Sequence, residues 1–270
     1  GTSVGFVISA ILVLSTRIPN AAPSEQNGAW SRVTSGTAIF MRTPRLRGIM
    51  ALNLVVAAGG SIVVVNTVNY VRDELSGTQA DVAWMLAASG GGTLLVALFL
   101  PRVLDRISER VVMMTGAGVL LAGVLGAVAM AATGTAEWAF TAPAWVVIGA
   151  GMALIVTPTG RVIRAAARQP ELPAAFAAQF SLSHLAWLLT YPIAGWIGTA
   201  FGLTLAWSIL AGLAIVGAIA APALWPRERS LEAIKVDAAR SRPADVALRE
   251  EADSAEGTLA ACQCACVRTV

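Results

Sequence analysis

Residues 49–71 read IMALNLVVAAGGSIVVVNTVNYV, a stretch without a single Asp, Glu, Lys or Arg. A helix rises about 1.5 Å per residue and the hydrocarbon core of a bilayer is about 30 Å thick, so about 20 apolar residues span it. The stretch is therefore predicted to be a membrane-spanning helix. Five more stretches of spanning length follow, at residues 82–104, 111–132, 139–160, 174–200 and 203–225. Together they predict an all-α, polytopic membrane helix bundle.

The composition of the whole chain supports this fold class. Hydrophobic residues make up 56% of the 270 residues and charged residues 13%, whereas roughly a quarter of the residues of a soluble domain are charged. The lipid bilayer is therefore the expected surrounding. A net charge of +3 is too small to indicate binding to nucleic acid.

The basic residues predict the orientation of the six-helix unit, residues 49–225. They collect before the first span and after the second, fourth and sixth, while the other connections hold Arg72 among acidic residues. Cytoplasmic connections carry an excess of Lys and Arg, so both ends of the unit are predicted to face the cytoplasm. The basic residues on that side are Arg17, Arg32, Arg42, Arg45, Arg47, Arg102, Arg106, Arg110, Arg161, Arg164, Arg168, Arg227, Arg229 and Lys235.

The first 48 residues are expected to contain two parts. Residues 1–16 are apolar but short, and Arg17 follows them, so we expect the end of an earlier membrane span and a chain that is a piece of a longer protein. Residues 17–48 contain Pro, Ser, Asn and Gly and are predicted to be a cytoplasmic linker without a long helix. Its cluster of Arg42, Arg45 and Arg47 either contacts anionic lipid or only fixes the topology.

Residues 226–270 are polar and are predicted to form a cytoplasmic tail. The tail ends in Cys262, Cys264 and Cys266, the only cysteines of the chain. Thiolates bind soft metals such as zinc, but three ligands without a nearby His leave two alternatives, a metal site and an unstructured end. The metal alternative would make the protein a membrane-embedded sensor or a metal-handling protein. With an unstructured end, the protein is expected to carry no metal and no other cofactor.

Polar residues are unevenly distributed among the six spans. Inside a bilayer they are costly and usually face the bundle interior or an aqueous path. The first and fifth spans hold most of them, so these two spans are predicted to line a cavity. The third and sixth are predicted to face lipid or to be purely structural. The polar set comprises Asn53, Asn66, Asn69, Tyr70, Gln179, Ser181, Ser183, His184 and Tyr191. Glycines such as Gly92 and Gly149 favour close helix contacts in the second and fourth spans.

The strongest candidate site lies in the fifth span. His184, the only histidine, falls about 15 Å into the membrane at helical rise. Phe180, His184, Trp187 and Tyr191 recur at helical spacing and share one face. This stripe suits a substrate site, and a histidine titrates near neutral pH and could carry a coupling proton. The alternative is a packing histidine that bonds a neighbouring helix.

Three amides are further cavity candidates: Asn66 and Asn69 near the outer end of the first span, and Gln179 in the fifth. Each asparagine could equally bond another helix. The sequence contains no paired carboxylates at an interior position, no Ser-His-Asp set and no nucleotide-binding loop, so an enzyme or an ATP-driven pump is not expected.

Residues 101–110, PRVLDRISER, resemble the loop motif G-x-x-x-D-R-x-G-R-R of the major facilitator superfamily. Asp105, Arg106 and Arg110 match it, whereas Pro101, Ser108 and Glu109 depart from it. That motif joins the second and third helices of each six-helix half. Residues 157–161, TPTGR, and 191–196, YPIAGW, are also similar to bacterial permeases of this superfamily.

The resemblance implies the C-terminal half of a twelve-helix permease, from the end of helix six to helix twelve. It implies six spans in two inverted three-helix repeats around a midplane site, with the missing N-terminal half of the same polypeptide as partner. It implies a bacterial inner-membrane secondary transporter of a small molecule, working by alternating access, with efflux preferred and protons as a candidate coupling ion. Asp105, Arg106 and Arg110 would then belong to a conformational latch on the inner face.

Overall fold

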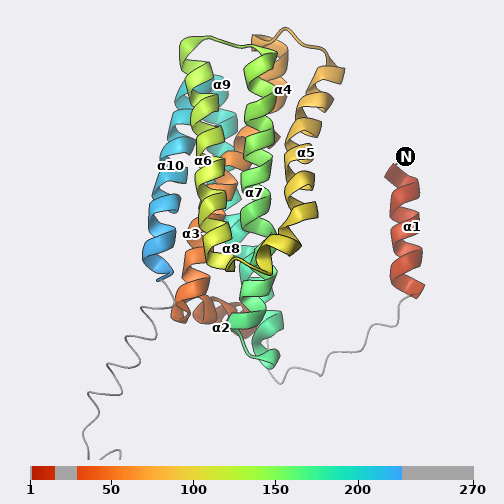
Figure 1. Ribbon diagram of the computed structural model, residues 1–270, viewed down its shortest axis with the longest axis vertical. Helices are drawn as coiled ribbons and strands as arrows, with labels where there is room; N and C mark the ends of the chain where they lie inside the picture. Colours follow the sequence, from red (N-terminus) through yellow and green to blue (C-terminus); the bar gives the residue numbers. More distant parts are fainter. Residues whose placement is uncertain (1, 16–28, 227–270) are drawn as a thin grey trace, which may run out of the picture.

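The computed structural model describes residues 2–15 and 29–226. Its described residues are almost wholly helical and contain no strand, and six of the helices are long and apolar enough to cross a membrane (Figure 1). This confirms the predicted all-α bundle. The six spans are Pro44–Glu74, Gln79–Leu104, Glu109–Thr133, Trp138–Ala166, Gln169–Phe201 and Leu203–Leu224, mostly a few residues longer than the apolar stretches that predict them.

The first span changes its helix type along its length. It begins with α3 (Pro44–Ser61), whose Pro44 sits in the first turn, where a missing N–H costs nothing. The π-helical segment Ile62–Asn66 follows, then the single turn α4 (Thr67–Asn69) and a second π-helical segment, Tyr70–Glu74. Such π segments are rare and often lie at functional sites.

The second, third and fourth spans are α5 (Gln79–Leu104), α6 (Glu109–Thr133) and α7 (Trp138–Ala166). A capping box between Thr78 and Asp81 starts α5. Helices α5 and α7 pack closely, because Gly149 leaves no room for a side chain beside the Ser89 carbonyl, and the Thr93 hydroxyl donates a 3.1 Å hydrogen bond to the Gly149 carbonyl. Gly92 makes the reciprocal approach to Val146, which fits the close contacts expected of these glycines.

The fifth span starts with the 3₁₀ turn Gln169–Glu171 and continues as α8 (Leu172–Pro192). Directly after Pro192 the chain adopts the π-helical segment Ile193–Ile197, and α9 (Gly198–Phe201) completes the span. Gly202 alone separates it from the sixth span, α10 (Leu203–Leu224). With φ at +92°, Gly202 occupies a backbone region that other residues rarely adopt.

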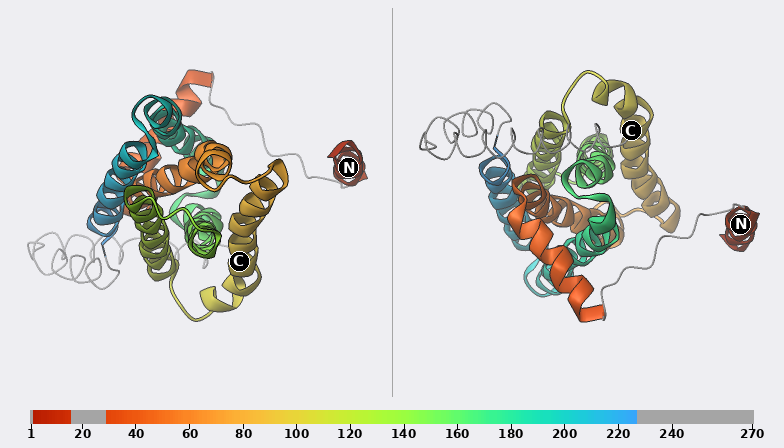
Figure 2. Two further views of the ribbon diagram at one scale, coloured as in Figure 1. Left: turned by 90° about the horizontal axis from the view of Figure 1, so that it is seen from above. Right: turned by 90° about the horizontal axis from the view of Figure 1, so that it is seen from below.

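The two predicted cavity-lining spans differ most in burial. The first span lies at the centre of the bundle, between α6, α7, α8 and α10, and 72% of its most apolar window is buried (Figure 2). The fifth span lies at the edge, where only 11% of the corresponding window is buried. The first span is therefore the packing axis of this bundle, a role that its many polar residues do not suggest.

Two further helices precede the spans. Helix α1 (Thr2–Ser15) stands apart from the bundle in Figure 1, with its side chains from Val7 to Ser15 exposed. Helix α2 (Ala29–Arg42) lies across the end of the bundle that carries most of the arginines (Figure 2, right). The predicted linker thus does contain a helix of 14 residues. Tertiary packing outweighs its polar composition, because Phe40 is fully buried and Gly36 touches the first turn of α8.

Candidate functional site

The first and fifth spans meet along a row of side-chain contacts. The Asn53 and Gln179 amides exchange hydrogen bonds of 3.3 and 3.0 Å, across a sequence separation of 126 residues. Further out, the Ser61 hydroxyl donates to Thr190 at 2.7 Å across 129 residues, and Asn66 reaches Ala194 across 128. A nearly constant separation means that the two spans run parallel, as two spans that both begin on the same membrane side must.

Asn66 joins its own span to two others, the fifth and the sixth. Its amide nitrogen donates to the Ala194 carbonyl at 2.8 Å, and its amide oxygen accepts from the Trp207 indole nitrogen at 3.0 Å. The side chain is 1% exposed. The Ala194 carbonyl belongs to the π-helical segment after Pro192, where the regular helix hydrogen bonds are interrupted. Asn66 therefore makes the interhelical bonds that were its alternative role, and Gln179 does the same with Asn53.

The predicted stripe on α8 forms two aromatic pairs. The rings of Phe180 and His184 lie 4.0 Å apart between centroids, and those of Trp187 and Tyr191 lie 5.0 Å apart. Trp187 rests on the first span, in the space that a side chain at Gly60 would fill. Phe180, His184 and Tyr191 are exposed in this bundle. The stripe is thus a surface beside the first span. His184 lies near the middle of the fifth span, fifteen residues after Gln169 and seventeen before Phe201.

The hydrogen bonds of His184 stay within its own helix. Its Nδ1 lies 2.8 Å from the Phe180 carbonyl and 3.4 Å from the Ser183 hydroxyl. A carbonyl only accepts, so the 2.8 Å bond assigns the proton of a neutral ring to Nδ1. Nε2 is then the basic nitrogen. Among the described residues, no side chain or carbonyl of another helix forms a hydrogen bond with His184. The structure therefore gives no interhelical bond in support of the alternative, a packing histidine.

A different face of α8 is purely apolar. Leu182, Leu185 and Leu189 recur at helical spacing and, together with Met50 of α3, line an open hollow of about 490 Å³. Nothing polar lines this hollow, so it suits the acyl chains of lipid. The fifth span therefore has three kinds of surface: a polar face packed on the first span, an aromatic face with His184, and a leucine face.

The first span leaves little of itself exposed. Between Pro44 and Val71 only Val64, Val68 and Asn69 are exposed. They follow Gly60, the residue that the Trp187 ring contacts, by one helical turn or more. Of the three amides predicted for the cavity, Asn69 is the one that remains available to a ligand. The aromatic stripe and this exposed strip together define the candidate substrate surface.

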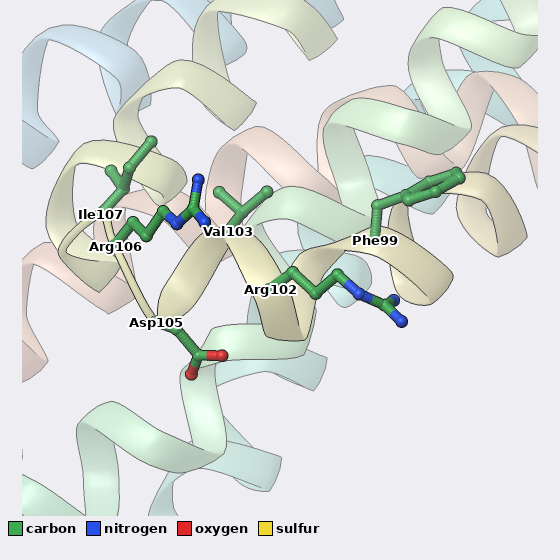
Figure 3. A pocket seen from close by; sticks show the side chains of 6 residues that line it. All are labelled: Phe99, Arg102, Val103, Asp105, Arg106 and Ile107. Atoms are coloured by element: carbon green, nitrogen blue, oxygen red, sulfur yellow. The ribbon is translucent and has the colours of Figure 1, made fainter.

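The predicted latch residues separate into two groups. Asp105 and Arg106 are exposed in the turn after α5, beside a hollow of about 640 Å³, and Figure 3 shows their charged groups pointing apart. Arg110 instead donates from Nε to the Trp225 carbonyl at 2.8 Å, which places a cation at the C-terminal end of α10. Sequence reasoning missed the nearby ion pair of Glu109 and Arg161, whose atoms lie 3.2 Å apart. Glu109 is one of the departures from the motif.

A second feature missed from the sequence is an aromatic cluster near the end of the bundle that lies opposite the arginine-rich end. Tyr70, Trp145 and Trp207 are fully buried, with ring centroids 5.1 to 6.1 Å apart. The Trp145 indole nitrogen donates to the Thr67 hydroxyl at 2.7 Å. This cluster joins the first, fourth and sixth spans just beyond Asn66. The sequence signal that could have predicted this cluster is that Trp145 and Trp207 lie at similar depths in two different spans.

The possible metal site cannot be placed, because Cys262, Cys264 and Cys266 lie outside the described residues. In residues 2–15 and 29–226 no group of three or more metal-binding side chains comes together.

Six apolar helices, with a polar seam between two of them and an exposed aromatic surface beside it, define a multi-pass membrane protein. A sequence profile described as Major Facilitator Superfamily matches residues 49–256, which is most of the chain. The chain therefore belongs to the Major Facilitator Superfamily, a family of transporters rather than enzymes. No curated protein matches the chain in a sequence search.

Proposed function

We propose that the protein is a secondary active transporter of a small organic molecule that works by alternating access. The observation that carries the proposal is the division of the fifth span into a packed face, a leucine face and an exposed aromatic face around His184. The aromatic face lies at mid-span, where transporters bind substrates. Its exposure in this six-helix bundle supports a second six-helix unit as the opposite wall of the site.

The chemistry of the surface supports an apolar, flat substrate. Phe180, Trp187 and Tyr191 offer ring faces, and the spans hold no carboxylate near them. Solutes of this kind partition into the bilayer and can diffuse inward without a carrier, and an exporter would lower their concentration in the cytoplasm. We therefore propose export across the cytoplasmic membrane, with both ends of the six-helix unit in the cytoplasm, as the arginine distribution predicts.

His184 is the proposed coupling group, because its Nε2 makes no hydrogen bond among the described residues and is the ring nitrogen open to a proton. Asp105 and Arg106 are proposed to hold one conformation by pairing with the opposite half. Their present lack of an ion-pair partner among the described residues fits a contact that exists in only one of the two conformations. Losing it would shift the populations of the two states without touching the substrate.

Flux in inside-out membrane vesicles tests the proposal. Vesicles from cells that express the protein would be incubated with a panel of aromatic compounds in the outer medium, with and without an imposed proton gradient. The wild type should accumulate at least one compound with the gradient, and His184→Ala should lose that accumulation. The matched control is Leu185→Ala, which shortens a neighbouring side chain that is also exposed but lies on the leucine face, and it should leave the flux unchanged.

Each result has a distinct meaning. If no compound moves with the gradient in wild-type vesicles, the proposed proton-driven export is wrong. If flux is normal and survives His184→Ala, transport stands and His184 is not its coupling group.

A further inference from the structure

Helix α2 and the connection between α7 and α8 enclose a hollow of about 430 Å³ at the arginine-rich end of the bundle. It is remote from the aromatic surface proposed for substrate. Arg42 and Thr43 line one side, at the end of α2, and Arg168 and Glu171 line the other. Ile39 and Pro170 are among the apolar residues between them.

The walls of the hollow are held in place by packing. Phe40 of α2 is fully buried in the bundle core, and Gly36 fits so closely against the Ala174 carbonyl that a side chain there has no room. These two contacts fix α2 against the first turn of α8. The distance between Arg42 and Arg168 is therefore set by the fold rather than by a loose linker.

The charge of the hollow favours an anion. Arg42 and Arg168 are both exposed, and within the described part of the chain neither guanidinium makes an ion pair or a hydrogen bond. Glu171 is the only acidic group in the lining, and its Oε2 already accepts a 3.1 Å bond from the Arg168 backbone N–H. Two arginines without an ion-pair partner among the described residues thus line the same hollow as one carboxylate that is already engaged.

We propose that this hollow binds the phosphate of an anionic phospholipid from the adjoining leaflet. Basic pockets between helices on the cytoplasmic side bind such headgroups, and planar guanidinium groups hold phosphate oxygens in pairs. A lipid fits better than free phosphate because apolar residues, Ile39 and Pro170 among them, line the hollow together with the arginines, and because Met41, next to Arg42, is 46% exposed. The headgroup then lies beside α2, which runs across the ends of the spans (Figure 2), and the acyl chains pass Met41 into the bilayer.

Lipid selection in nanodiscs tests the site. The full chain would be placed in discs of equal amounts of phosphatidylglycerol and phosphatidylcholine, extracted, and analysed by native mass spectrometry for retained lipid. The wild type should retain phosphatidylglycerol preferentially. Arg42→Gln and Arg168→Gln should each reduce this preference about fivefold, the effect of one arginine at a membrane surface. Glu171→Gln should increase it, since it removes the only opposing charge and keeps an acceptor for the backbone bond.

The control is Arg102→Gln, which removes one exposed arginine at the same end of the bundle but outside the hollow. It should leave the preference unchanged. An equal loss in Arg102→Gln would show diffuse attraction to the membrane and overturn the proposal, as would an unchanged preference in the double variant of Arg42 and Arg168. Inorganic phosphate forms the second arm. If millimolar phosphate removes the retained lipid as effectively as added phosphatidylglycerol does, the hollow is a site for soluble anions instead.

Discussion

The first and fifth spans contain similar amounts of polar side chain and use them differently. In the first span, Asn53, Ser61 and Asn66 are buried and each bonds the fifth span. In the fifth, the partners Gln179 and Thr190 form one face only, while Phe180 and His184 remain exposed. A polar residue within a membrane span therefore does not by itself mark a cavity. A polar residue indicates a cavity only when no neighbouring helix buries it and forms a hydrogen bond with it.

The buried side of this comparison should be the most sensitive to substitution. Asn66→Leu removes the partner of both the Ala194 carbonyl and the Trp207 indole nitrogen at a position that is 1% exposed. An unsatisfied buried group costs about 1–3 kcal/mol, so we expect the free energy of unfolding to fall by about 2–4 kcal/mol. Unfolding by sodium dodecyl sulfate in mixed micelles, followed by tryptophan fluorescence, measures this loss.

Asn69→Leu is the matched control, since Asn69 lies three residues further along the same span and is exposed. Its effect should stay within about 0.5 kcal/mol. Equal losses in the two variants would contradict the division between a packed and an exposed amide.

The contact of Gly60 with Trp187 comes next. Gly60→Val fills the space that the Trp187 ring occupies, so the ring must leave the first span or the helices must separate. Overpacking of this kind costs about 1–3 kcal/mol, and the same unfolding measurement applies. Gly90→Val makes the same substitution where no neighbouring atom lies within 4 Å. A loss as large for Gly90 as for Gly60 would mean that valine is disfavoured by the helix itself and not by Trp187.

A smaller effect is expected for the pair of Asn53 and Gln179. A double-mutant cycle with Asn53→Leu and Gln179→Leu should give a coupling energy of about 0.6 to 1.7 kcal/mol, the range for polar pairs between membrane helices. Measured stabilities of the two single variants and the double variant supply it. A coupling energy near zero would leave Gln179 free to take part in substrate binding, as its sequence position first indicates.

The smallest effect on stability is expected at the exposed side of the comparison. His184→Leu removes only bonds within one helix turn, so the free energy of unfolding should change by less than about 0.5 kcal/mol. Transport by this variant should nevertheless be lost, because His184 is the proposed coupling group. Substantial destabilisation without a specific transport defect would instead indicate a structural histidine.

Much of the fold follows from the sequence because hydrophobic length is a local property. The six spans and the predicted orientation need only apolar runs and arginine positions. The direction in which Asn66 points is not local, since it depends on the π segments and on Trp207 from another span. Helix α2 was missed for the same reason, because its stability comes from Phe40 packing on a distant part of the chain. The aromatic stripe was found because all four residues share one helix.

The connection between the fifth and sixth spans consists of Gly202 alone, and this affects how the two spans insert into the membrane. From Leu172 to Pro226 the chain contains no Asp, Glu, Lys or Arg, and only this one glycine interrupts its helices. No charged side chain has to be carried across the bilayer when this segment is translocated. We therefore expect the last two spans to leave the translocon as one helical hairpin, in contrast to the first two, whose connection carries Arg72, Asp73 and Glu74. An acceptor site for glycosylation inserted beside Gly202 would report whether the pair inserts together.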